Sequence, residues 1–294
     1  MMRGCYQFSQ VDVFTAQPCF GNPVAVVHDA VGLSTEQMRD FTHWTNLSEC
    51  TFLLPPTAAG RAAGAHYRVR IFCPGRELPF AGHPTLGTCH AWLEAERAAG
   101  RGTPAVVVQE CGAGLIRIRR EGARLAFAAP PRLRAGPLAE ADVALIARGL
   151  GLARSDILDH AWCDNGPPWR GILLGSAEQV LNLRPDPTLL AGMDLGVVGP
   201  HAMAPGMAES VEQPQFEVRA FFPGNHGLTE DPVTGSLNAA LAQWLMGTGR
   251  APDRYVAAQG TVLGRAGRVH VHKSEGAVWI GGDCVTCIEG TVRL

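Results

Sequence analysis

Hydrophobic and polar positions alternate with a period of two along much of the chain, which is typical of β-strands with one buried face. The alternating stretch 6–14 is followed, after a Pro/Gly turn, by a second apolar stretch at 22–29, and together they predict a β-hairpin. Similar apolar or alternating segments predict strands at 50–54, 66–72, 105–110, 115–120, 124–129, 170–175, 216–222, 254–260, 268–272, 277–281 and 286–294.

Helical segments are fewer, and each has a recognisable start or stop. Ser34 with Gln37 three residues later forms a capping-box signature, which predicts a helix running to about residue 44. Gly151 stops a helix predicted from residue 139 to 150. The two longest helices are predicted at 84–98 and 232–246, each beginning with a proline at its first helical position. Each half of the chain is therefore mostly strands with one dominant helix.

The regions around the two long helices resemble each other. Segment 70–93 aligns with segment 219–245 when a single-residue gap is allowed. Before the gap, Arg70, Phe72, Pro74 and Gly75 match Arg219, Phe221, Pro223 and Gly224, and after it His83, Pro84, Gly87 and Thr88 match Asp231, Pro232, Gly235 and Ser236. The shared strand, turn and helix indicate a duplication. The proline-rich stretch 129–137 predicts the boundary between domains 1–128 and 129–294, with the last strand free to pair with the first domain.

Composition narrows the class of protein. A chain of 294 residues, with 46% hydrophobic and 18% charged residues, suits one large or two medium globular domains. The net charge of -2 gives no electrostatic reason to expect a nucleic acid or an anionic membrane as partner. Nine cysteines at scattered spacings favour reduced thiols, and with no signal-peptide pattern at the N-terminus we expect a cytoplasmic protein.

Several cofactor classes fit the sequence poorly. Lys273 is the only lysine and follows no glycine-rich loop, which argues against a pyridoxal enzyme and a Walker-type phosphate site. The Cys284–Cys287 pair is a solitary CxxC, and His270 with His272 offers no third ligand, so no metal site is expected. We expect no organic cofactor either.

The starts of the two long helices are the best candidates for chemistry. Glycine and proline leave backbone N–H groups uncovered there, and the helix dipole makes that end electropositive, so it suits a carboxylate. If the duplicated halves face each other, both helix starts meet in one cleft, which is a hypothesis drawn from the repeat. Asp231 is open to two interpretations that do not exclude each other: a helix N-cap or a group that takes part in the chemistry.

Four blocks of the sequence resemble those of PhzF-like proteins, which are relatives of diaminopimelate epimerase. The blocks are DVFTAQPCFGNPVAVV, NLSECTF, ELPFAGHPTLGT and EDPVTGSLNAALAQWL, and with the ending GGDCVTCIEGTV they span nearly the whole chain. The resemblance implies an α+β fold of two similar domains, each a β-barrel-like sheet around a central helix, with the active site between them. It also implies a homodimer.

The resemblance assigns roles to individual residues. Glu49 matches the family's catalytic glutamate, and His83 and Asp231 match the polar catalytic residues at the two helix starts. Gly82, Gly235 and Ser236 match positions that hold the substrate. The related epimerases carry a cysteine at each helix start, and since His83 and Asp231 stand there instead, a two-thiol racemase is not expected. From the residues alone, Glu49 would be interpreted as a solvated residue at the end of a strand and His83 as a structural histidine. Ser236 would be interpreted as a helix-start residue that bonds its own backbone.

The function implied is a cofactor-independent isomerase or epimerase that relocates a proton on a small metabolite carrying a carboxylate. Glu49 would act first as a base and then as an acid, so burial must raise its pKa from the usual value of about 4.3. The closest named precedent is isomerisation of dihydro-3-hydroxyanthranilate in phenazine biosynthesis. The alternative is a binding or interaction protein that keeps the fold without catalysis, although such a protein has no need for an acid–base set.

Overall fold

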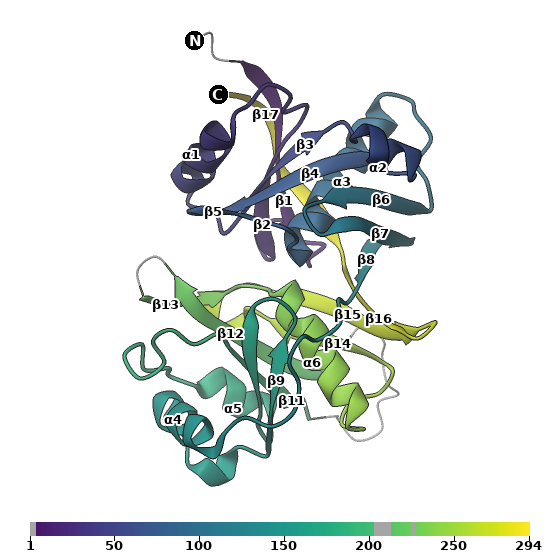
Figure 1. Ribbon diagram of the computed structural model, residues 1–294. Coiled ribbons are helices and arrows are strands. Elements are labelled where there is room, and N and C mark those ends of the chain that lie inside the picture. Colours follow the sequence, from purple (N-terminus) through teal and green to yellow (C-terminus); the bar gives the residue numbers. More distant parts are fainter. Residues whose placement is uncertain (1–3, 203–212, 225–226) are drawn as a thin grey trace. The chain divides into compact units, whose positions relative to one another are not determined.

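The computed structural model describes residues 4–202, 213–224 and 227–294 (Figure 1). The chain divides into two compact units. The N-terminal unit comprises residues 1–128 and 281–294, and the C-terminal unit comprises residues 129–280. The α+β fold expected from the sequence is confirmed, because each unit combines a many-stranded sheet with three helices among the described residues.

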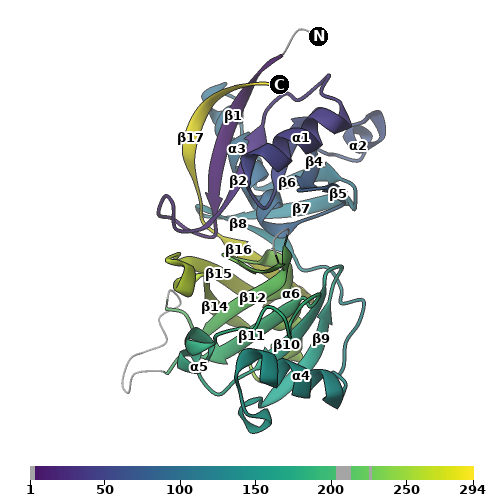
Figure 2. The same cartoon turned by 90° about the vertical axis from the view of Figure 1, so that its left-hand side faces the viewer.

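The N-terminal unit contains nine strands and three helices in its described part. The strands are β1 (Cys5–Val13), β2 (Asn22–Val27), β3 (Cys50–Leu54), β4 (Tyr67–Cys73), β5 (Arg76–Leu78), β6 (Val106–Cys111), β7 (Gly114–Glu121), β8 (Arg124–Ala128) and β17 (Cys284–Arg293). The helices are α1 (Thr35–Thr45), α2 (Ala58–Ala62) and α3 (Gly82–Ala98). The last strand of the chain pairs with the first, so β17 and β1 run side by side (Figure 2).

Helix α3 is the centre of this unit. It packs against β1, β2, β3, β6, β8 and β17, and its buried residues lie on most sides of the helix rather than along one stripe. That all-round burial is typical of a helix enclosed by a sheet. Gly87 allows the close approach, because a Cβ added there would stand 2.4 Å from a methyl group of Val24 on β2.

The C-terminal unit is built from eight further strands, three α-helices and two short 3₁₀ helices. The strands are β9 (Asp159–Asp164), β10 (Pro168–Leu173), β11 (Leu195–Pro200), β12 (Phe216–Gly224), β13 (Gly227–Asp231), β14 (Arg254–Gln259), β15 (Gly267–Ser274) and β16 (Ala277–Gly282), whose last two residues belong to the N-terminal unit. The helices are α4 (Glu140–Leu150), α5 (Ala177–Asn182) and α6 (Gly235–Gly247), with 3₁₀ turns at Arg154–Asp156 and Thr261–Leu263. Helix α6 is buried on most sides, as α3 is.

Strand pairing confirms the duplication. In the N-terminal unit β1 is antiparallel to β2, β2 parallel to β3, and β3 antiparallel to β4; β9, β10, β11 and β12 repeat these three pairings in the same order. Strand β4 then forms a hairpin with β5 and pairs in parallel with β6, and β12 does the same with β13 and β14. Helices α3 and α6 occupy the same place in this order, between the hairpin and the parallel strand.

Most elements expected from the sequence are present, and three differences matter for the site. The Ser34–Gln37 capping box and the left-handed Gly151 at the end of α4 are both confirmed. Helix α3 begins at Gly82, two residues before the expected start, whereas α6 begins at Gly235, three residues after its expected start. Strands β5, β9, β11 and β13 and helices α2 and α5 were not expected.

Among the described residues, no helix has the length and apolar character needed to cross a membrane.

Candidate active site

Glu49 and His83 lie next to each other in the N-terminal unit. Glu49 immediately precedes β3, and His83 is the second residue of α3. Their side chains approach to 3.5 Å, measured from the imidazole Nε2 to a carboxylate oxygen; the side chain of His83 is 7% exposed and that of Glu49 is 18% exposed. The expectation that Glu49 is a solvated strand-end residue is therefore wrong. The pair places a carboxyl group and an imidazole in one shielded position.

Burial decides the charge of His83. It lowers the pKa of the imidazole from 6.5 to about 3, and a hydrogen bond with the backbone of Pro23 acts in the opposite direction. His83 is thus neutral near pH 7, and its contact with Glu49 is not an ion pair. A neutral imidazole has its N–H donor on one nitrogen and its lone pair on the other, so the nitrogen that faces Glu49 matches either the carboxylate or the carboxylic acid, depending on the tautomer.

The hairpin of β1 and β2 supports this pair from one side. Asn22, the first residue of β2, is 1% exposed, and its Nδ2 lies 3.4 Å from Nδ1 of His83. The buried carboxylate of Asp12 accepts a hydrogen bond of 2.9 Å from the N–H of Gly21, which fixes the chain just before Asn22. Sequence reasoning missed both side chains, although they stand in the first block that resembled the family.

Asp231 does not cap a helix. It is the last residue of β13, paired with Ala220, and the N-cap of α6 is Thr234. The carboxylate of Asp231 accepts a hydrogen bond of 2.7 Å from the hydroxyl of Thr234. The expectation of an aspartate cap followed by a proline at the first helical position is therefore wrong, while a part in the chemistry stays a prediction.

Gln259 at the end of β14 explains why α6 starts late. Its Oε1 accepts hydrogen bonds from the Thr234 N–H (3.1 Å) and from the Asn238 side chain (2.8 Å). Its Nε2 donates to the Thr234 hydroxyl (2.9 Å) and to the carbonyl of Asp231 (3.1 Å). Since this side chain takes the Thr234 N–H, that group makes no helical bond to residue 230. In α3 a helical bond already runs from the N–H of Thr85, which matches Val233 in the repeat, to the carbonyl of Ala81 (3.1 Å).

Gly235 and Ser236 form the first turn of α6. Ser236 is held at two points by the hairpin of β9 and β10: its hydroxyl oxygen accepts a hydrogen bond of 3.1 Å from the indole of Trp169, and its carbonyl accepts one of 2.8 Å from Asn165. The first helical hydrogen bond of α6 runs from the Asn238 N–H to the carbonyl of Thr234. The N–H groups of Gly235 and Ser236 precede it, so this end of the helix is a donor site.

The six predicted site residues thus form two groups, one in each unit. Glu49, His83 and Gly82 surround the start of α3, and Asp231, Gly235 and Ser236 surround the start of α6. Supporting residues that sequence reasoning missed are Asn22, Trp169, Asn165 and Gln259. That both groups act on one substrate stays a prediction.

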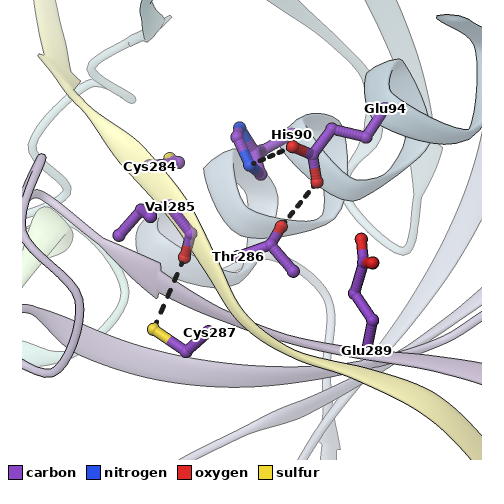
Figure 3. A pocket seen from close by; sticks show the side chains of 7 residues that line it. All are labelled: His90, Glu94, Cys284, Val285, Thr286, Cys287 and Glu289. Atoms are coloured by element: carbon purple, nitrogen blue, oxygen red, sulfur yellow. Dashed lines mark hydrogen bonds and ion pairs between the residues drawn. The ribbon is translucent and has the colours of Figure 1, made fainter.

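A separate cavity of about 520 Å³ lies between α3 and β17 in the N-terminal unit (Figure 3). Glu94 accepts a hydrogen bond of 2.5 Å from Thr286 and lies 3.3 Å from His90. Glu289 also lines the cavity, and none of the six predicted site residues does. Two carboxylates with no lysine or arginine in the lining disfavour a ligand that carries a carboxylate.

The thiols near the family blocks are unsuited to act as bases. Cys50 and Cys89 are both buried, which raises the pKa of their thiols to about 11 and about 12. Both therefore remain protonated near pH 7. In the described part of the chain, no group of three or more His, Cys, Asp and Glu side chains is arranged to hold a metal ion.

Comparison with known proteins shows which family and fold the chain resembles. Residues 11–290 match the PhzC-PhzF family model, described as phenazine biosynthesis-like protein. The chain is 34% identical to the protein named antisense-enhancing sequence 1 of Schizosaccharomyces pombe, over 97% of this chain and 98% of the relative. It is 32% identical to a trans-2,3-dihydro-3-hydroxyanthranilate isomerase of Pseudomonas aeruginosa, over 97% and 94% of the two chains. A Bacillus anthracis protein of the PhzF family shares the fold, with a TM-score of 0.79, 22% identity and coverage of 99% and 100%.

Proposed function

The chain belongs to the PhzC-PhzF family of phenazine biosynthesis-like proteins, and from that premise we propose that it relocates a proton on a small metabolite carrying a carboxylate. An isomerase is what the family leads one to expect, since several relatives bear that name. The observation that carries the proposal is the shielded contact of 3.5 Å between Glu49 and His83. The alternative of a binding protein without catalysis is not favoured.

Glu49 is the proton carrier in this proposal. Its carboxylate removes a proton from a carbon next to an extended π-system, and the electron pair shifts along that system. The resulting carboxylic acid then returns a proton to a different carbon, so atoms and electrons balance without an oxidant or reductant. His83, neutral and within 3.5 Å, lies beside this carboxyl group and can bond to it in the protonation state that matches the imidazole tautomer.

The start of α6 supplies the recognition of the substrate. The N–H groups of Gly235 and Ser236 and the positive end of the helix dipole favour a carboxylate. Asp231, held by Thr234, is an acceptor suited to an amine or hydroxyl of the same substrate. The proposed reaction uses no metal or organic cofactor. The homodimer and the cytoplasmic location expected from the sequence stay predictions, and light scattering in solution tests the first.

The test is isotope exchange at carbon. The enzyme is incubated in heavy water with trans-2,3-dihydro-3-hydroxyanthranilate, the compound in the name of the Pseudomonas aeruginosa relative. We expect the wild type to place deuterium on a ring carbon and Glu49→Gln to do so at least about 100-fold more slowly, because general acid–base catalysis is lost. The exposed Glu178→Gln is the matched control and keeps the wild-type rate. Undiminished incorporation by Glu49→Gln removes Glu49 from its role.

A further inference from the structure

The hairpin of β9 and β10 holds both polar groups of a single residue at the start of α6. Trp169 donates its indole N–H to the hydroxyl oxygen of Ser236, and Asn165 donates its amide to the carbonyl of the same residue. Trp169 is 4% exposed, so its ring is fixed by the core of the unit. Ser236 is therefore held in one position by two donors from one hairpin.

The direction of the Trp169 bond determines what Ser236 offers to a ligand. An indole N–H is a donor only, so the hydroxyl oxygen of Ser236 must accept it. The hydroxyl hydrogen then points away from the indole and is available to an acceptor. Together with the N–H groups at the start of α6, Ser236 presents donors to a ligand, which match the lone pairs of a carboxylate.

We propose that Trp169 is a positioning residue that fixes the Ser236 hydroxyl as a hydrogen-bond donor, and that this contact makes the start of α6 selective for a carboxylate over its neutral amide. The proposal rests on the proposed function, because it assigns the substrate's carboxylate to the same helix start. A carboxylate accepts at every oxygen, whereas an amide brings an NH₂ group that meets the donors unfavourably. The selectivity follows from that mismatch.

A purely structural role for the contact predicts something different. A buried indole N–H needs an acceptor, and Ser236 satisfies it in either case. If that is all the contact does, breaking it destabilises the unit but leaves the preference between the two ligands unchanged. The two roles are therefore distinguished by a ratio of affinities and not by stability.

Equilibrium binding to the full chain provides the test, with anthranilate and anthranilamide as probes that differ only in carboxylate against amide. The variants are Trp169→Phe, which keeps an aromatic ring and removes the donor, Ser236→Ala, and the double variant. We expect the wild type to prefer anthranilate. In each single variant the ratio of the affinities for anthranilate and anthranilamide should fall roughly tenfold, which corresponds to the loss of one hydrogen bond to a charged group. The double variant loses no more than Ser236→Ala, because both changes remove the same interaction.

Trp244→Phe is the matched control, because it removes a second buried indole from the same unit. We expect it to lower the unfolding midpoint without changing the preference. An unchanged preference in Trp169→Phe overturns the inference, and so does a loss that adds to that of Ser236→Ala. Binding needs no turnover, so a wild type that exchanges no deuterium, but whose preference for anthranilate falls in Trp169→Phe, contradicts the proposed function and leaves the role of Trp169 supported.

Discussion

The starts of the two central helices differ although the strands around them follow the same order. In α3 the helix extends to Gly82, so His83 lies inside the first turn and its imidazole is buried beside Glu49. In α6 the equivalent turn is not helical, and Asp231 stays at the end of a strand with its carboxylate on Thr234. The same topology therefore holds a shielded carboxyl–imidazole pair at one helix start and an aspartate at the end of a strand before the other.

A buried glutamine on the strand after each helix contacts the helix start, and the contacts differ between the two units. Gln109 on β6 and Gln259 on β14 occupy corresponding strands, and both are fully buried. Gln109 donates to the hydroxyl of Thr85, and the backbone N–H of Thr85 keeps its helical bond to Ala81. Gln259 takes both the N–H and the hydroxyl of Thr234. The two glutamines therefore support their helix starts through different contacts.

Removing these two glutamine side chains has the largest expected effect on stability. We predict that Gln259→Ala lowers the free energy of unfolding by about 3 to 5 kcal/mol, because it leaves several buried groups at the start of α6 unsatisfied. Gln109→Ala removes the hydrogen bonds to Tyr67 and Thr85 and costs about 2 kcal/mol. Urea unfolding measures both values. Equal losses would contradict the different roles assigned to the two residues.

The charge of His83 is expected to have the next largest effect. Its pKa in the folded chain is about 3 rather than 6.5, so as the pH falls the unfolded chain takes up this proton first. The stability that the neutral His83 contributes to the folded chain is fully present above pH 6.5 and is lost as the pH falls from there toward about 3. Between pH 7 and about pH 5 the loss amounts to about 2 kcal/mol.

His83→Asn, which has no titrating ring, is the comparison for this prediction. Urea unfolding at several pH values should show a smaller loss of stability on acidification for the variant than for the wild type. Identical pH dependence in the two proteins would mean that His83 is not held neutral by burial.

Close packing at α3 is expected to have the smallest effect of the three. A Cβ on Gly87 would stand 2.4 Å from a methyl group of Val24 and 3.0 Å from one of Val13, so Gly87→Ala should cost about 1 to 2 kcal/mol. Gly247→Ala at the end of α6 is the control, because an added Cβ meets nothing within 4 Å and should stabilise by up to about 1 kcal/mol. Thermal unfolding shows whether each substitution lowers or raises the unfolding midpoint. A stabilising Gly87→Ala would show that α3 has room to move.

Local signals in the sequence were sufficient for much of the fold. The Ser34–Gln37 capping box, Gly151 and the alternating strands depend on neighbouring residues, and the structure contains them. The repeat of strand, turn and helix led to the duplication. The short strands β5 and β13 were missed because three to five residues carry little periodicity.

The candidate site was less accessible to such reasoning, because its supports are distant in sequence. Gln259 acts on Thr234 across 25 residues, and Trp169 reaches Ser236 across 67. Nothing near Asp231 reveals that a side chain from β14 keeps the following turn out of a helix, so proline seemed to mark the helix start.

Steady-state kinetics of two variants test the division between the helix starts most directly. With trans-2,3-dihydro-3-hydroxyanthranilate as substrate, Glu49→Gln should lower kcat at least about 100-fold with little change in KM, because it removes the proton carrier. Ser236→Ala should raise KM roughly tenfold with kcat nearly unchanged, because it removes a contact to the substrate's carboxylate. A fall in kcat for Ser236→Ala as large as that for Glu49→Gln, or a Glu49→Gln enzyme that turns over normally, would contradict the assignment of proton transfer to one helix start and recognition to the other.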